Sequence, residues 1–99
     1  MRKVGRPRKI RLIKHDPQVK QFSPRGRPGR PDEVELSADE FEAIRLADNC
    51  GLGQSAAAES MGISQQTFSR ALRAAHKKIS AALVEGKIIR VTEESNPAR

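Results

Sequence analysis

Apolar positions between residues 37 and 49 recur at helical spacing and predict a first helix over residues 37–49. Ser37 and Glu40 have the spacing of a capping box, in which the serine hydroxyl caps a free backbone N–H and the glutamate reaches back to the serine backbone. Gly51 can supply the left-handed conformation with which helices commonly end. The segment should therefore be a capped amphipathic helix.

Two further helices are expected, at residues 54–61 and at residues 64–85. Ser64 can cap the start of the last helix, and Gly86 can end it. Six apolar residues recur along this helix at helical spacing: Phe68, Leu72, Ala75, Ile79, Ala82 and Leu83. One of its faces should be buried along most of its length.

The first 31 residues differ from the rest, because they hold five of the six prolines and three of the seven glycines. Such a segment cannot be a continuous helix, and we expect an extended basic arm. Residues 9–14 within it and residues 87–92 near the C-terminus are the two strand candidates. They could pair with each other or with a second copy, since an edge strand leaves backbone groups unpaired. Residues 93–99 should form a disordered tail.

These elements predict a mainly α fold: a three-helix domain of the helix-turn-helix type over residues 32–92, preceded by the arm and ending in a short strand. A helix-turn-helix needs small residues where its helices meet, a residue that can turn sharply between them, and apolar residues that fix their angle. Ala57 and Ala58 meet the first requirement and Gly62 the second. The apolar positions are occupied by Ala57, Met61, Ile63, Phe68 and Ala71.

Helical periodicity also assigns an outer face to the last helix, because Phe68 and Leu72 should face inward. The candidates for contacts to DNA bases on that face are Gln65, Gln66, Ser69, Arg70 and Arg73. Glutamine can pair with adenine and arginine with guanine in the major groove. The candidates for contacts to the DNA backbone are Ser64, Thr67, Lys77 and Lys78. The competing interpretation is an ordinary amphipathic helix with a polar exterior.

The net charge of +7 favours a polyanionic partner, because Lys and Arg that neutralise phosphates release condensed counterions. The charge is unevenly distributed. Residues 1–31 hold eleven bases and one acid, residues 32–60 one base and eight acids, and residues 61–90 six bases and one acid. This alternation favours a folded unit with one face turned away from DNA. The alternative is a solvated basic tail on an unrelated domain.

The chain from Glu35 to Val91 resembles a small family of predicted DNA-binding proteins, mostly from bacteria and archaea, that is catalogued as a domain of unknown function. The most specific parts are DEFEAIRLAD and GISQQTF, and the similarity covers roughly residues 6–92, including Phe22, Pro24 and Gly26. The resemblance implies a helix-turn-helix similar to region four of sigma factors, and DNA binding without a known target. Many members have cysteines where this chain has IRLI at residues 10–13, so no metal or redox role is carried over there.

Two arm segments resemble the core of an AT-hook: PRGRP at residues 24–28 and, more loosely, GRPRK at residues 5–9. A glycine between arginines lets an extended backbone enter the narrow minor groove of A·T-rich DNA. The candidate contacts are Arg6, Arg8, Arg25 and Arg27. Alternatively, proline and glycine simply build a turn here, and the arginines keep it soluble.

Other functions have little support in the sequence. A small, mostly aliphatic core leaves no room for a deep catalytic pocket, and neither His15 nor His76 has an acid or nucleophile spaced beside it, so we expect no enzyme. Cys50 stands alone and no Cys/His cluster has the spacing of a zinc site, so we expect no metal or other cofactor. Without a membrane-spanning run or signal peptide, we expect a cytoplasmic, nucleoid-associated protein with no membrane partner.

The sequence thus predicts sequence-specific duplex DNA binding, in transcription regulation, with the last helix in the major groove and the arm on the backbone or in a minor groove. We expect a homodimer, because one recognition helix on a small core rarely supplies enough specific affinity. Its candidate interfaces are the last helix around Ile79 and Leu83, and the strand at residues 87–92, of which we favour exchange of the strand. The alternative is a protein-interaction module that docks on RNA polymerase or a partner regulator. Its surface would be the acidic first helix, with Asp39, Glu40, Glu42 and Asp48.

Overall fold

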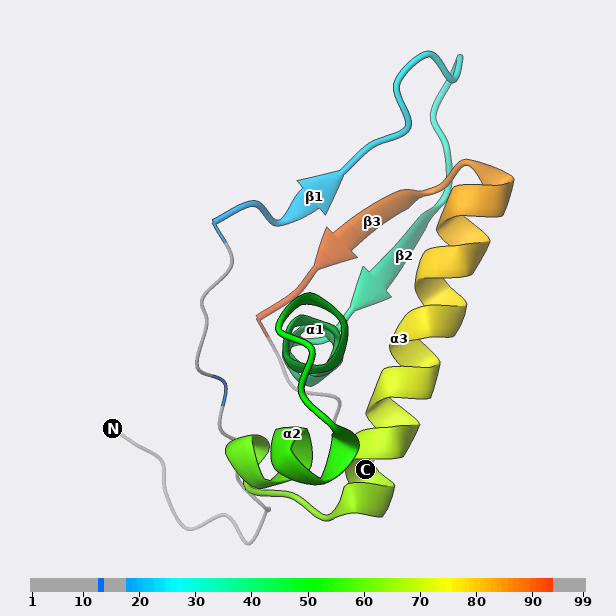
Figure 1. Ribbon diagram of the computed structural model, residues 1–99. Coiled ribbons are helices and arrows are strands. Elements are labelled where there is room, and N and C mark those ends of the chain that lie inside the picture. The colour runs from blue at the N-terminus through cyan, green and yellow to red at the C-terminus, as the bar shows by residue number, and fades with distance from the viewer. Residues whose placement is uncertain (1–12, 14–17, 94–99) are drawn as a thin grey trace, which may run out of the picture.

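Figure 1 shows the computed structural model, which describes residue 13 and residues 18–93. Its longest helix, α3, runs down one side of the molecule, and the other elements lie beside it. In chain order the elements are β1 (Gln21–Phe22), β2 (Glu33–Leu36), α1 (Ala38–Ile44), the π-helix η1 (Arg45–Asn49), α2 (Gln54–Met61), α3 (Gln65–Glu85) and β3 (Ile88–Val91). The described chain therefore combines three helices with a small three-stranded sheet.

The first predicted helix is present, and its start is the expected capping box. The Ser37 hydroxyl accepts a hydrogen bond from the Glu40 N–H (3.3 Å), and the Glu40 carboxylate accepts one from the Ser37 N–H (3.0 Å). The α-helical part is shorter than predicted, because η1 replaces its last turn. In this wider turn the Cys50 N–H reaches back five residues to the Arg45 carbonyl (2.8 Å). Gly51 follows at φ 79°, the expected left-handed stop.

The second and third helices also begin and end close to the predicted residues. Gly62 has φ 69° and ends α2, and its N–H donates to the Glu59 carbonyl (3.0 Å). Ser64 caps α3 through a bond from the Thr67 N–H (3.0 Å). Gly86 ends α3, again at φ 69°. Both glycines hold a backbone conformation that costs other residues energy.

One face of α3 is buried, as its periodicity predicts, and it contributes to two apolar clusters. The first half of α3 packs on α1, η1 and α2 in a cluster formed by Ala43, Leu46, Ala57, Ala58, Met61, Ile63, Phe68 and Leu72. The second half packs on the sheet in a cluster formed by Leu36, Ala75 and Val91, with Phe41, Ile79 and Ile89 beside them. Ile44 touches both clusters, so α1 joins the two halves of the core. The prediction that Leu83 shares the buried face is wrong, because this side chain is 75% exposed.

The sheet has the order β1-β3-β2, with β3 antiparallel to β1 and parallel to β2. The predicted C-terminal strand is confirmed as β3, but β2 was not expected. It places Val34 opposite Ile89 and Leu36 opposite Val91, so its apolar side chains alternate with exposed glutamates. Both edges of β3 are thus occupied within one chain. Exchange of this strand between two copies would have to break existing pairs.

The basic N-terminal segment contributes to this sheet from Gln21 onward, which differs from the predicted domain boundary at residue 31. The Val91 N–H donates to the Lys20 carbonyl (2.8 Å), and Phe22 pairs with Ile89. The strand predicted at residues 9–14 lies outside the described residues except for Ile13, which packs on the first cluster. The tail predicted at residues 93–99 also lies outside them except for Glu93.

Three acidic residues of α1 are buried, which corrects the expectation of an exposed acidic helix. Asp39, Glu40 and Glu42 are 2%, 2% and 0% exposed. Glu42 accepts a bidentate bond from the Arg45 guanidinium (2.9 and 2.8 Å), which raises the pKa of Arg45. Asp39 accepts from the Ser37 hydroxyl (2.6 Å). These carboxylates are part of the fold, because a buried charge must be paired or hydrogen-bonded.

Arg27 closes the end of α3 from the loop between β1 and β2. Its Nη1 donates to the Glu85 carbonyl (2.9 Å) and lies over Gly86, where an added Cβ would be 2.7 Å from Nη1. A cation at this position also complements the negative end of the helix dipole. The loop and the last turn of α3 are therefore joined.

We predict that Gly86→Ala lowers the free energy of unfolding more than Gly51→Ala does. Both substitutions put a Cβ in a left-handed conformation, which costs about 1–2 kcal/mol. Only the first displaces Arg27, whose bond to Glu85 adds about 1 kcal/mol, whereas a Cβ at Gly51 meets nothing within 4 Å. Denaturant unfolding of the two variants, alone and combined with Arg27→Ala, measures the difference. Equal losses in the presence of Arg27 would contradict the prediction.

Candidate nucleic-acid interface

A short turn sets α2 against the start of α3, at the lower end of the molecule in Figure 1. The Ile63 N–H donates to the Ala58 carbonyl (3.1 Å), and Gly62 reverses the chain. Ala57, Met61 and Phe68 fill the space between the helices, each with 0% of its surface exposed. Only small side chains at residues 57 and 58 allow this close approach, so the angle between the helices is fixed by packing.

The first turn of α3 carries two hydroxyls beside its free backbone N–H groups. Ser64 donates to the Thr67 hydroxyl oxygen (2.9 Å) and accepts from the Thr67 backbone. Since each hydroxyl has one hydrogen to donate and one bond joins the two, one hydroxyl hydrogen remains for another acceptor. A helix N-terminus with such a donor suits a phosphate oxygen.

Four of the five predicted base-contacting residues line one shallow, open concavity of about 470 Å³: Gln65, Gln66, Ser69 and Arg70. The first two and Arg70 are exposed, while Ser69 is half-buried and donates to the Gln54 side chain at the start of α2. Gln54 was not predicted, because its position at a helix start carries no local signal for this contact. Ser69 therefore holds α2 against α3, and the concavity offers two amides and one guanidinium.

The basic residues of α3 fall into two groups. Lys78 is half-buried, and its Nζ donates to the Glu35 carbonyl and to Glu40 (both 2.8 Å), while His76 pairs with Asp48 (2.6 Å). Within the described part of the chain, no ion pair involves Arg70, Arg73 or Lys77, and all three are exposed. Positive charge that is not neutralised internally thus begins at the concavity and continues along the outer side of α3.

Exposed bases on the sheet are neutralised instead. Arg90 donates to both Glu33 oxygens (3.2 and 3.1 Å), which raises the pKa of Arg90. Lys20 bonds Glu93 and lowers the pKa of that carboxyl. The sheet surface is therefore less attractive to a polyanion than the outer side of α3.

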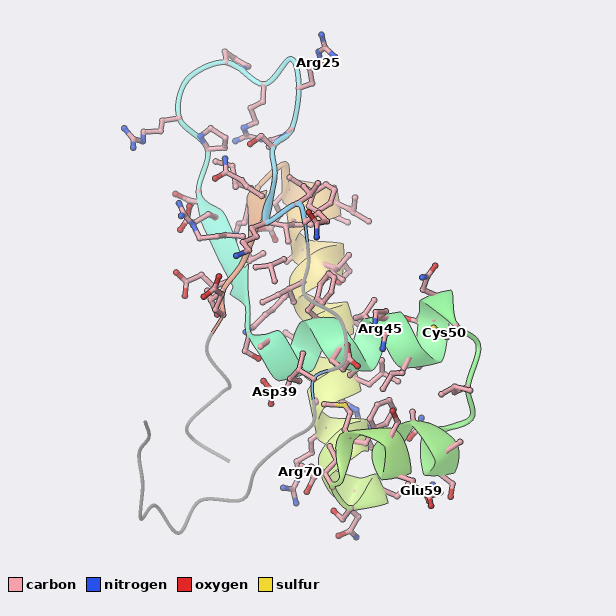
Figure 2. The ribbon with its side chains drawn as sticks, turned by 90° about the vertical axis from the view of Figure 1, so that its left-hand side faces the viewer. Arg25, Asp39, Arg45, Cys50, Glu59 and Arg70 are labelled. Atoms are coloured by element: carbon pink, nitrogen blue, oxygen red, sulfur yellow. The ribbon has the colours of Figure 1, made fainter. Side chains whose placement is uncertain are left out.

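The predicted arm contacts are separated from the concavity. Arg25 lies on the loop between β1 and β2, at the opposite end of the molecule from Arg70 (Figure 2). Arg27 is held on the end of α3, and Gly26 is in a turn in which the Arg27 N–H approaches the Pro24 carbonyl (3.4 Å). Arg6 and Arg8 lie outside the described residues. PRGRP is thus a turn in this structure, as the alternative interpretation of the segment predicts.

Metal-binding and membrane-spanning features are both absent from the described residues. Among residues 13 and 18–93, no group of three or more His, Cys, Asp and Glu side chains is arranged to hold a metal ion. No helix in the same residues is long and apolar enough to cross a membrane.

Comparison with known proteins identifies relatives but no solved structure that matches. The chain is 47% identical over 88 residues to a UPF0251 protein of Prosthecochloris aestuarii, covering 88% of this chain and 57% of the relative. It is 52% identical over 86 residues to a UPF0251 protein of Methanothermobacter thermautotrophicus, covering 87% of this chain and 45% of the relative. It thus spans about half the length of these two relatives. A UPF0251 protein of Vibrio vulnificus is 43% identical over 93 residues, which are 93% of both chains.

The match to a protein family covers residues 1–96, nearly the whole chain. That family is described as "Protein of unknown function DUF134". Relatives in bacteria and archaea agree with this assignment. The chain belongs to the DUF134 family.

Proposed function

We propose that the chain binds duplex DNA sequence-specifically, as a transcription regulator, through a helix-turn-helix formed by α2, residues 62–64 and α3. The observation that carries the proposal is the exposed outer side of the first turns of α3. There Gln65, Gln66 and Arg70 surround a concavity, and Arg70 forms no ion pair with any described residue. Amides and guanidinium groups are the side chains best suited to base edges in the major groove.

The length of α3 limits which residues reach the bases. The major groove is about 12 Å wide, and a helix rises about 1.5 Å per residue, so about eight residues fit within it. These are the residues from the N-cap Ser64 to about Ala71, which include every residue that lines the concavity. Arg73 lies about one turn beyond Arg70 and Lys77 about two turns beyond it, so both are better placed for contacts to phosphates. The Thr67 hydroxyl would add a further phosphate contact.

Two of the predicted DNA-contacting residues, Ser69 and Lys78, form hydrogen bonds within the fold, so we assign them a different role in this proposal. The Ser69 hydroxyl donates to the Gln54 side chain, and Lys78 donates two of its three ammonium hydrogens to the Glu35 carbonyl and to Glu40. Both position α3 relative to the rest of the fold. We therefore propose that they act on DNA binding through the orientation of α3 and not by direct contact.

The competing proposal, docking on RNA polymerase or a partner regulator, has less support. It needs an exposed acidic surface on α1, but Asp39, Glu40 and Glu42 are buried. The two proposals differ in salt dependence, because DNA binding weakens steeply with salt while apolar docking does not. The role proposed here is binding without a catalytic step, in the cytoplasm at the nucleoid.

We predict that Gln66→Ala and Arg70→Ala each relax the preference at one base position, by about 1–3 kcal/mol if the contact is bidentate. The measurement is binding to a site selected from random DNA and to its single-base variants. Arg90→Ala is the control, because it removes an exposed arginine from the sheet. Equal losses on all sequences would show that the two side chains contact phosphate or nothing.

We further propose a homodimer, which would read two half-sites about 34 Å apart. Leu83 and Val84 near the end of α3 are 75% and 84% exposed, whereas both edges of β3 are already paired. The helix surface is therefore the better candidate for the interface.

We predict that the double variant Leu83→Ser/Val84→Ser is monomeric by light scattering and keeps the helical circular dichroism of the parent, because both side chains are exposed within one chain. Val19→Ser is the matched control, since Val19 is also exposed (55%) but lies on another surface. A monomeric parent at high micromolar concentration would refute the dimer.

A further inference from the structure

We propose that the loop between β1 and β2, residues 23–32, is a second DNA-binding surface that holds a different duplex from the one bound by α3. The inference rests on the proposed function and deepens it. It specifies which DNA the loop arginines contact and makes the protein a bridge between two DNA segments.

The loop is longer than its connection requires. β1 and β2 lie on either side of β3, where Phe22 pairs with Ile89 and Glu33 with Ile88, so the two ends of the loop are close together. Two strand spacings are about 9.6 Å, which about three extended residues can cross. Ten residues make the connection instead, and they project beyond the sheet as the uppermost part of Figure 1. Compact surface loops of this length with neighbouring ends are frequently functional.

The chemistry of the loop suits a polyanion. It contains three arginines, Arg25, Arg27 and Arg30, and one acid, Asp32, at its end. Arg27 is held by its bond to the Glu85 carbonyl, whereas Arg25 and Arg30 are exposed, and no ion pair within the described residues involves either. There is open space beside two loop glycines, because a Cβ added at Gly26 or Gly29 would meet nothing within 4 Å. The tip is therefore anchored at Arg27 and otherwise open to a partner.

The position of the loop separates it from the first duplex. From Gln65 to Glu85 the helix rises about 30 Å at about 1.5 Å per residue, and Arg27 fixes the loop to its far end. Arg25 and Arg70 accordingly lie at opposite ends of the molecule (Figure 2). A straight helix whose first eight or so residues fill a major groove about 12 Å wide has left that groove before its last turns. Arg25 and Arg30 thus belong to a loop at the end of the molecule opposite the DNA at α3.

The test measures capture of a second duplex. A site selected from random DNA is immobilised, the full chain is bound to it, and a fluorescent A·T-rich duplex is added. The double variant Arg25→Ala/Arg30→Ala should bind the immobilised site like the parent but capture about tenfold less of the fluorescent duplex. The slope of log capture against log salt should fall by about 0.9 for each phosphate that the variant no longer neutralises.

The control Lys20→Gln/Arg90→Gln removes the same two charges from the sheet and should leave capture unchanged. Equal weakening of both duplexes by the loop variant would put the loop on the first duplex and overturn the inference. Capture that is abolished in Leu83→Ser/Val84→Ser but kept in the loop variant would assign bridging to dimerisation and also overturn it. A parent that binds the immobilised site and captures nothing would refute the bridge alone, whereas a parent that binds neither duplex would refute the proposed function as well.

Discussion

The burial of one face of α3 is the constraint on which the rest of the structure depends. Its first half closes the cluster with α2, and its second half closes the cluster with the sheet, so a rotation of the helix would open both. Burying a side chain such as Phe68 or Leu72 stabilises the fold by about 1.5–3 kcal/mol, whereas an exposed ion pair contributes about 0–1 kcal/mol. The apolar face therefore decides the orientation, and Gln66 and Arg70 point outward because Phe68 and Leu72 point inward.

A second constraint is the polar junction at Glu40, which ties three elements together. Its carboxylate caps α1 through the Ser37 N–H and pairs with Lys78 of α3, whose ammonium also bonds the Glu35 carbonyl of β2. Because Glu40 is 2% exposed, removal of the lysine would leave a buried carboxylate with fewer partners, but the Lys78 side chain is 36% exposed, so water can replace part of the lost interaction. The junction explains how a lysine on α3 contributes to the fold that presents the candidate interface.

The features that the sequence predicted correctly are those that depend on residues close together in the chain. The capping box at Ser37, the left-handed glycines and the helical periods were all readable, because each acts within a few residues. The strand β2 could not be predicted in this way, since its glutamates have low strand propensity and its parallel partner, β3, lies more than fifty residues away in the chain. The same distinction holds at the candidate site. The outward direction of Gln66 follows from periodicity, whereas the internal bonds of Ser69, Lys78 and Arg27 depend on residues from other elements.

The contacts made by the two halves of α3 explain why this helix is long. With 21 residues it is nearly twice as long as an average helix of about 11–12, although its first half suffices to pack α2 and carry the concavity. The second half holds the sheet, and Arg27 ties the β1–β2 loop to its last turn. A flexible basic arm would only raise the local concentration of positive charge. A loop fixed to a rigid helix instead holds its exposed arginines at a set distance from Arg70, so that any DNA bound at the two ends would be held in a defined relative position.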